Sequence, residues 1–519
     1  MSASDSGEPQ FSPLRASLWP VHRFELKKLI PMLLIFFLIS FDYNVLRTMK
    51  DTLVVTAKSS GAEVIPFIKV WIMFPGAILM TYAFTRLSRR MSWESVVYVM
   101  LGFFLCYFAF FTFVLYPMRD VLHPHVTADA LQAILPSGFK GMIAMFRNWT
   151  FTSFYVMSEL WSPIILTMLF WGFASEVTRL QEAKRFYGLF GIGANLSGIF
   201  AGQISVFFCR SDFNPNFPFG TTAWEQTLVK LVSLVIITGI LAIILFRWMN
   251  TRVLTDPRFY DASEKKAERN VQKKLSMRDS LNTLLKSKYL ISIAIVVIGY
   301  NIAVNLVEVV WKDQMKTLYP NPEDFNLYFN QVSTIIGIIA TLSALLVSGN
   351  SIRKFGWTFT ALLTPVVILI TSFAFFFAFF MQDQLEVAAM AFFGVTPLVM
   401  VVFLGSLQNI ATRAAKYSVY DATKEMAFIP LGPEDRLKGK AAIDGVCNRL
   451  GKSSGSLIHQ FLLMIHSSIA LSSPYVAIIL FVVIIFWLNS TRALGQQFTE
   501  LTSDELEPKE NEALVGVIV

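Results

Sequence analysis

Long apolar stretches alternate with short polar segments along almost the whole chain. Each apolar stretch is about 20 residues long, which is the length an α-helix needs to cross a bilayer. The pattern therefore predicts an all-α polytopic membrane protein with twelve transmembrane helices. We expect the spans near residues 28–48, 64–85, 95–116, 149–174, 187–209, 227–247, 289–311, 327–349, 357–381, 386–411, 441–468 and 473–490.

The polar segments carry a charge bias that predicts orientation. If both termini are cytoplasmic, roughly 31 of the 44 Lys and Arg residues lie in or beside cytoplasmic segments, as the positive-inside rule requires. The strongest basic block separates two sets of six spans. We expect a cytoplasmic N-terminal segment 1–27, a six-helix bundle 28–247, a basic cytoplasmic linker 248–288, a second six-helix bundle 289–490 and a cytoplasmic tail 491–519.

Composition excludes several classes of protein. Of the 519 residues, 54% are hydrophobic and only 15% are charged, whereas a soluble domain is about 25% charged. The net charge of +8 is explained by membrane orientation and does not call for nucleic acid as a partner. Cys106, Cys209 and Cys447 lie in or beside apolar stretches, so they form neither a disulfide framework nor a metal-ligand spacing. We expect no cofactor.

The two halves show a distant internal repeat. The segments NVLRTMKD (44–51) and NLVEVVWKD (305–313) share an Asn, a charged residue three positions later and a Lys-Asp pair, with one residue slipped. GANLSG (193–198) and GKSSGS (451–456) form a second, weaker pair. Two parallel repeats of six spans are the plan of the major facilitator fold, whose substrate site lies between the halves at mid-membrane.

Glu159 lies near the centre of the span 149–174, too far from either end to reach water. A charge at mid-bilayer costs roughly 2.5–3.5 kcal/mol, so such residues usually have a function. Pro163 follows four residues later, where it removes the donor to the Glu159 carbonyl and can bend the helix. The alternative is a protonated structural carboxyl bonded to a neighbouring helix. We predict a site residue.

The span 289–311 carries a polar stripe. Asn301, Asn305 and Glu308 lie on one helix face, which must face water or another helix rather than lipid. Glu308 is also four residues from Lys312, and such a pair is an ordinary device of exposed helices. The repeat places Glu308 opposite Arg47, so the two halves are expected to present complementary charges to one cavity.

Four basic residues complete the candidate set. Arg449 and Lys452 lie in the Gly- and Ser-rich span 441–468, while Arg47 and Lys69 lie near span ends, where they could also reach outward to the headgroups. A phosphate-binding P-loop is rejected, because five residues separate Gly445 from Gly451 and no strand precedes them. Arg and Lys are nevertheless natural phosphate partners. The excess of positive charge predicts a transporter of an organic or phosphate-bearing anion.

Several long strings resemble one known family. DYNVLRTMKDTLVVTAKSSGAEVIPFIK, RNWTFTSFYVMSELWS, GFASEVTRLQEAKRFYGLFGIGAN, NLVEVVWKDQMK and DATKEMAFIPLGPEDRLKGKAAID, the last followed by RLGKSSG, are similar to the ATP/ADP translocase (nucleotide transporter) family of obligate intracellular bacteria and plastids. The resemblance covers residues from about 20 to 495. RTMKD stands where many members read RDTKD, which makes the surroundings of Thr48 more basic and affects nucleotide preference or coupling.

The resemblance implies a transporter, not an enzyme, that exchanges external ATP for internal ADP. It implies roles for Lys69, Glu159, Glu308 and Lys452, with Lys440 as a rival to Lys452. Phosphate or protons are candidate co-substrates, and a functional monomer in the bacterial inner membrane is expected, with both termini cytoplasmic. The rivals are a proton-coupled nucleotide importer and a nucleotide-handling membrane enzyme. The substrate-binding residues we expect are Arg47, Lys69, Glu159, Asn301, Asn305, Glu308, Arg449 and Lys452.

Overall fold

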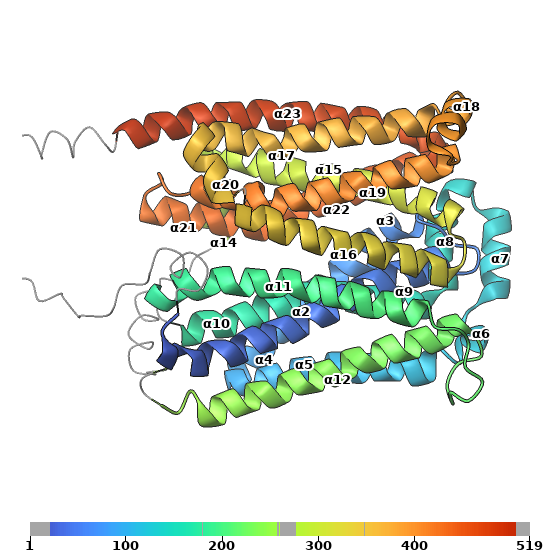
Figure 1. Ribbon diagram of the computed structural model, residues 1–519, viewed down its shortest axis with the longest axis horizontal. Helices are drawn as coiled ribbons and strands as arrows, with labels where there is room; N and C mark the ends of the chain where they lie inside the picture. The colour runs from blue at the N-terminus through green and yellow to red at the C-terminus, as the bar shows by residue number, and fades with distance from the viewer. Residues whose placement is uncertain (1–20, 179, 257–258, 260–276, 347, 505–519) are drawn as a thin grey trace, which may run out of the picture.

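The computed structural model describes residues 21–178, 180–256, 259, 277–346 and 348–504. In these ranges the regular structure is helical, with no strand. The long helices run side by side, and the chain leaves the start of α2 (Leu26–Val55) and the end of α23 (Ile469–Asp504) at the same end of the bundle (Figure 1). We call this the terminal end and the opposite one the far end.

The first half contains six long helical segments, several of them broken by a π-helical stretch. The label η marks these stretches and also the short 3-10 helices η1 and η4. A group of short helices lies at the far end of this half (Figure 1). The elements are η1 (Arg23–Glu25), α2, α3 (Val64–Ile68), η2 (Lys69–Met73), α4 (Phe74–Arg90), α5 (Trp93–Phe110), η3 (Phe111–Leu115), α6 (Arg119–Leu122), α7 (His125–Ile134), η4 (Ser137–Phe139), α8 (Lys140–Arg147), α9 (Trp149–Trp161), η5 (Ser162–Trp171), α10 (Gly172–Val177), α11 (Leu180–Cys209) and α12 (Ala223–Arg252).

The second half repeats this plan with fewer additions at its far end. The elements are α14 (Met277–Lys286), α15 (Lys288–Leu318), α16 (Pro322–Leu346), α17 (Ser348–Phe380), α18 (Glu386–Ala388), η6 (Ala389–Phe393), α19 (Pro397–Ala415), η7 (Lys416–Tyr420), α20 (Asp421–Met426), α21 (Pro433–Ala442), η8 (Ile443–Cys447), α22 (Asn448–His466) and α23. The two halves meet mainly where α11 packs against α16, with α2 beside them (Figure 1).

Eleven helical segments of the described chain are long and apolar enough to cross a membrane. The twelfth predicted span, 441–468, is also helical, because α21, η8 and α22 follow one another from Pro433 to His466. Its Gly, Ser and charged residues make this segment too polar to meet the same requirement for an apolar helix. The segment nevertheless packs against α15 and α23. The chain is therefore an all-α polytopic membrane protein with twelve transmembrane helices, six in each half.

One sequence expectation is wrong in a useful way. Arg47 lies near the end of the expected first span, 28–48, where it could reach the headgroups, and Lys50 lies just beyond that end. The helix instead continues to Val55, and Lys50 is only 3% exposed. Lys312 is likewise inside α15 and 3% exposed. Apolar run length underestimates these helices because their last turns are polar yet packed against protein.

Parts of the expected linker and tail lie outside the described residues. The first half ends with α12 running to Arg252, and α14 occupies Met277–Lys286 within the expected linker 248–288. Residues 260–276 and 505–519 are not described.

Candidate functional site

A chain of alternating charges crosses the interface between the halves. Asp51 accepts from Lys50 at 3.1 Å and from Lys312 of the other half at 2.9 Å. Lys50 reaches Glu159 at 3.1 Å, and Lys312 reaches Glu308 at 3.0 Å. Arg413 lies 3.6 Å from Glu308. We call these six residues the charge chain: Glu159, Lys50, Asp51, Lys312, Glu308 and Arg413.

The middle of the charge chain is sealed and its ends are accessible. The side chains of Lys50, Asp51 and Lys312 are 4%, 1% and 3% exposed, whereas those of Glu159 and Glu308 are 28% and 15% exposed. Buried charges are tolerated only when they are paired. The charge chain contains three cations and three carboxylates, so its formal charges sum to zero.

Three further cations lie around the charge chain, and none of them pairs with a carboxylate among the described residues. Within the described residues, Arg47, Lys69 and Lys452 have no ion pair. Lys69 and Lys452 both act electrostatically on Glu159, and Arg47 and Lys69 act on Glu308. One terminal nitrogen of Arg47 is buried with no hydrogen-bond partner. The interface therefore presents an excess of positive charge, which favours a bound anion.

The helix irregularity predicted at Pro163 is present, and the structure shows others near the site. Pro163 has no N–H to offer the Glu159 carbonyl, and the α-helix α9 widens into the π-helix η5 at Ser162. Lys69 is the first residue of another π-helix, η2. Arg413 stands shortly before η7, and Lys452 shortly after η8. Such π-helical stretches are frequent at functional sites.

The two predicted asparagines hold helices together. Asn301 donates to the Asn448 side chain at 2.9 Å and to the Val297 carbonyl at 2.8 Å. Asn305 donates to the Lys452 carbonyl at 3.0 Å and accepts from Lys69 at 3.2 Å. Asn305 thus connects two of the unpaired lysines, whereas Asn301 joins α15 to α22.

Small residues let α22 approach α15 closely. A Cβ added at Gly451 would lie 2.8 Å from the Asn301 Cβ, and one at Gly455 would lie 2.8 Å from the Asn305 Cβ. Neither distance leaves room for a side chain. This spacing sets Lys452, between the two glycines in sequence, beside the interface.

Two basic residues lie apart from these contacts. Arg449 is exposed and, among the described residues, makes no hydrogen bond or ion pair. Lys440 pairs with Glu425 at 2.5 Å on a surface where both side chains are nearly half exposed. Lys452, rather than Lys440, therefore lies within electrostatic range of Glu159.

Four members of the charge chain were absent from the expected set: Lys50, Asp51, Lys312 and Arg413. The repeat carried a signal for three of them, because it aligned Lys50-Asp51 with Lys312-Asp313. Nothing in the sequence indicated that Asp51 would pair with lysines of both halves. Arg413 was assigned to a cytoplasmic segment, but α19 extends to Ala415 and buries most of it.

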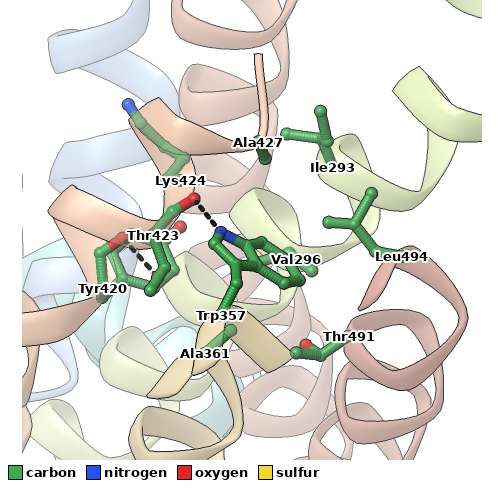
Figure 2. Close-up of a pocket in the computed structure, with 10 residues that line it drawn as sticks. All are labelled: Ile293, Val296, Trp357, Ala361, Tyr420, Thr423, Lys424, Ala427, Thr491 and Leu494. Atoms are coloured by element: carbon green, nitrogen blue, oxygen red, sulfur yellow. Dashed lines mark hydrogen bonds between the residues drawn. The ribbon is translucent and has the colours of Figure 1, made fainter. Parts of the chain in front are cut away.

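A small pocket of about 20 Å³ lies elsewhere, inside the second half. Figure 2 shows Trp357 at its centre, with its indole N–H donating to the Thr423 carbonyl at 3.0 Å. The Lys424 amino group points away from the indole and pairs with Asp444 at 2.9 Å. The remaining lining is largely apolar. This pocket is part of the packing of α17 against α20 and is separate from the charge chain.

Solved structures share the fold. A bacterial homologue of the iron transporter ferroportin, in an inward-facing state, aligns with a TM-score of 0.54 at 15% identity and covers 90% of this chain and 98% of that one. A D-xylose-proton symporter aligns with a TM-score of 0.52 at 14% identity, covering 90% and 97%. These likenesses show the transporter architecture alone.

Sequence relatives are much closer. "ADP,ATP carrier protein 1" of Chlamydia muridarum is 46% identical over 495 residues, covering 95% of this chain and 93% of that protein. "ADP,ATP carrier protein 1, chloroplastic" of Arabidopsis thaliana is 42% identical, covering 95% and 77%. The model of the TLC ATP/ADP transporter family matches residues 4–498. The chain is a multi-pass membrane transporter, and it belongs to the TLC ATP/ADP transporter family.

Proposed function

We propose that this protein exchanges external ATP for internal ADP across a bacterial inner membrane. The observation that carries the proposal is the set of unpaired cations, Arg47, Lys69 and Lys452, around a charge chain that is already balanced. A polyphosphate tail supplies the missing negative charge, and guanidinium and ammonium groups are its usual partners. The relatives named ADP,ATP carrier support this choice of anion.

Alternating access is supported by where the halves are joined. Hydrogen bonds between side chains of the two halves, within the described chain, lie from the middle of the helices to the far end. They include Cys209 to Asn326 at 3.3 Å and Ser137 to Ser467 at 2.7 Å. With both termini in the cytoplasm, as the Lys and Arg bias favours, the far end is external. The structure then corresponds to a carrier closed to the outside.

Exchange, rather than one-way transport, follows from electrostatics. In an empty site the unpaired cations repel one another strongly, because the dielectric constant is low. A bound phosphate tail removes this repulsion, so only the loaded carrier encloses its cargo and changes the side to which it is open. ATP and ADP differ by about one charge, and each charge moved is worth about 2.3 kcal/mol per 100 mV of membrane potential. All six residues of the charge chain come from one polypeptide, so a monomer suffices.

Purified protein in liposomes tests the exchange directly. Labelled ATP is added outside vesicles that contain ADP or only buffer, and the recovered nucleotide is analysed. We expect rapid uptake of unchanged ATP with internal ADP and little uptake without it. Equal uptake in both would contradict exchange, and recovery of hydrolysed nucleotide would point to an enzyme.

Proton-coupled import is the second candidate, because one acid of the first half lacks a cation. Asp42 is fully buried, its Oδ2 has no hydrogen-bond partner, and its Oδ1 contacts the Thr238 hydroxyl. A carboxyl in such surroundings could hold a proton. Uptake that a protonophore abolishes and internal ADP does not affect would select this alternative.

A further inference from the structure

We propose that Asp51 is a positioning residue that locks the two halves together near the far end and releases them when a polyphosphate binds. This inference rests on the proposed nucleotide exchange. It identifies the contact that makes opening of the far end depend on bound nucleotide. Asp51 would touch no substrate. It would act through Lys50 and Lys312.

The geometry sets Asp51 apart from the other acids. One carboxylate oxygen accepts from Lys50 of its own helix, and the other accepts from Lys312 of the opposite half. Glu159 and Glu308 pair only with lysines of their own halves. In the described part of the chain, the contact between Asp51 and Lys312 is the one ion pair that joins the halves.

Burial makes this ion pair hard to open without help. Asp51 and Lys312 are 1% and 3% exposed, so water is not available to solvate either charge when they separate. Separation would leave Asp51 with Lys50 alone and Lys312 with Glu308 alone, so each buried charge would lose one of its two partners, which is unfavourable where water is excluded. An empty carrier therefore stays closed at the far end.

A polyphosphate offers Lys312 a replacement partner. Lys69 and Lys452 bring the anion to the accessible side of the interface, next to Glu159 and Glu308. Phosphate oxygens can then accept from Lys312 as Asp51 leaves, while Asp51 remains paired with Lys50. Lys312 then keeps two anionic partners, Glu308 and the phosphate, so the halves can part. Nucleotide binding and opening of the far end are thereby coupled.

Contacts that are not ion pairs, beyond the lock, provide a readout of the far end. Ser137 of the first half donates to Ser467 of the second at 2.7 Å. Gly138 is pressed against the backbone of Met464, where an added Cβ would lie 2.6 Å away. The Lys316 amino group contacts the Ser60 carbonyl, again across the halves. These contacts must break whenever the far end opens.

Transport measurements compare Asp51→Asn with a matched control, Asp313→Asn. Asp313 is the repeat counterpart of Asp51, but its described hydrogen bond is to the neighbouring Gln314 at 3.3 Å. We expect wild-type protein and D313N to take up ATP only with internal ADP. In D51N the ratio of uptake with ADP to uptake without ADP should fall about fivefold or more. An unchanged ratio in folded D51N overturns the inference.

A second measurement keeps Asp51 intact, so it does not depend on the folding of D51N. Ser137→Cys and Ser467→Cys are combined in protein whose three cysteines, Cys106, Cys209 and Cys447, are replaced by Ser. ATP or ADP should slow disulfide formation across the far end about fivefold, and adenosine should not. Equal rates with ATP and adenosine overturn the lock. If wild-type protein exchanges ATP for ADP while either test fails, the lock is wrong and the proposed function stands.

Discussion

The Lys-Asp pairs at equivalent positions of the two halves behave differently. Lys50 and Lys312 each pair with a glutamate of their own half, at 3.1 and 3.0 Å. Asp51, however, accepts from both lysines, whereas Asp313 accepts from Gln314. The two lysines of the repeat therefore make equivalent ion pairs in their own halves, whereas the two aspartates have different partners. Among the described residues, Asp51 is the one carboxylate that pairs with a cation of the other half.

The helix pairs around the site also differ between the halves. In the first half, a Cβ on Gly198 of α11 would lie 3.6 Å from the Asn44 side chain, an ordinary contact. In the second half, the same construction at Gly451 of α22 gives 2.8 Å to Asn301. The second half is packed more tightly at its site helix, and it carries Lys452 there.

The largest expected effect comes from removing the base of the second half. Lys312→Gln leaves Asp51 and Glu308 without the cation that they share. Loss of one partner from a buried pair costs about 3–5 kcal/mol, so the free energy of unfolding should fall by about that amount. Chemical unfolding in detergent measures it. The double variant K312Q/E308Q should be less destabilised, because one of the stranded carboxylates is then gone. A loss below about 1 kcal/mol in K312Q would mean that the pair is not buried as described.

The packing contrast predicts the next largest effect. Gly451→Ala forces a Cβ against Asn301 and should lower the free energy of unfolding by about 1–3 kcal/mol. Gly198→Ala should cost much less, and Gly445→Ala, which meets nothing within 4 Å, serves as the control. Thermal unfolding of the three variants compares them. Equal losses at Gly451 and Gly198 would remove the distinction between the halves.

Substrate affinity separates two basic residues of α22. Lys452→Gln should raise the KM for ATP about tenfold, because a charge-assisted bond to phosphate is worth roughly 1.5–3 kcal/mol. Arg449→Gln should change it by less than about twofold, since Arg449 makes no ion pair within the described residues and, unlike Lys452, is not among the cations that act on Glu159. Initial rates of ATP uptake at varied ATP give both values. The opposite ranking would move the anion site away from Glu159.

The smallest effect concerns the far-end segment 119–147, which belongs to the first half alone. Burial lowers the pKa of His123 to about 4, and its ring contacts the Thr150 hydroxyl at 2.6 Å. Below about pH 6.5 the unfolded segment binds a proton that the folded one does not, so its stability falls by about 1 kcal/mol per pH unit. Hydrogen exchange of this segment should therefore be faster at about pH 5.5 than at about pH 7.5, after correction for intrinsic rates. In His123→Gln this extra pH dependence should disappear.

Sequence reasoning reached the architecture and part of the site. Apolar run length predicts the twelve helices, including the polar one that carries Lys452, because even that helix keeps enough apolar residues to be recognised. Mid-span position selects Glu159, since a charge there has no route to water. The polar stripe with Asn301 and Asn305, together with the internal repeat, selects Glu308. Asp51 could not be selected in this way. Its position near a span end suggested exposure, and its burial depends on contacts with a helix from the other half of the chain.

The central claim is that basic side chains at the interface hold the phosphates of a nucleotide. Binding of labelled ATP to purified protein, with unlabelled ATP, ADP and adenosine as competitors, tests it most directly, using wild-type protein and the folded double variant K69Q/K452Q. We predict saturable binding that ATP and ADP displace and adenosine does not, and loss of most of this binding in the variant. Displacement by adenosine as effective as that by ATP, or unchanged affinity in the variant, would contradict the account.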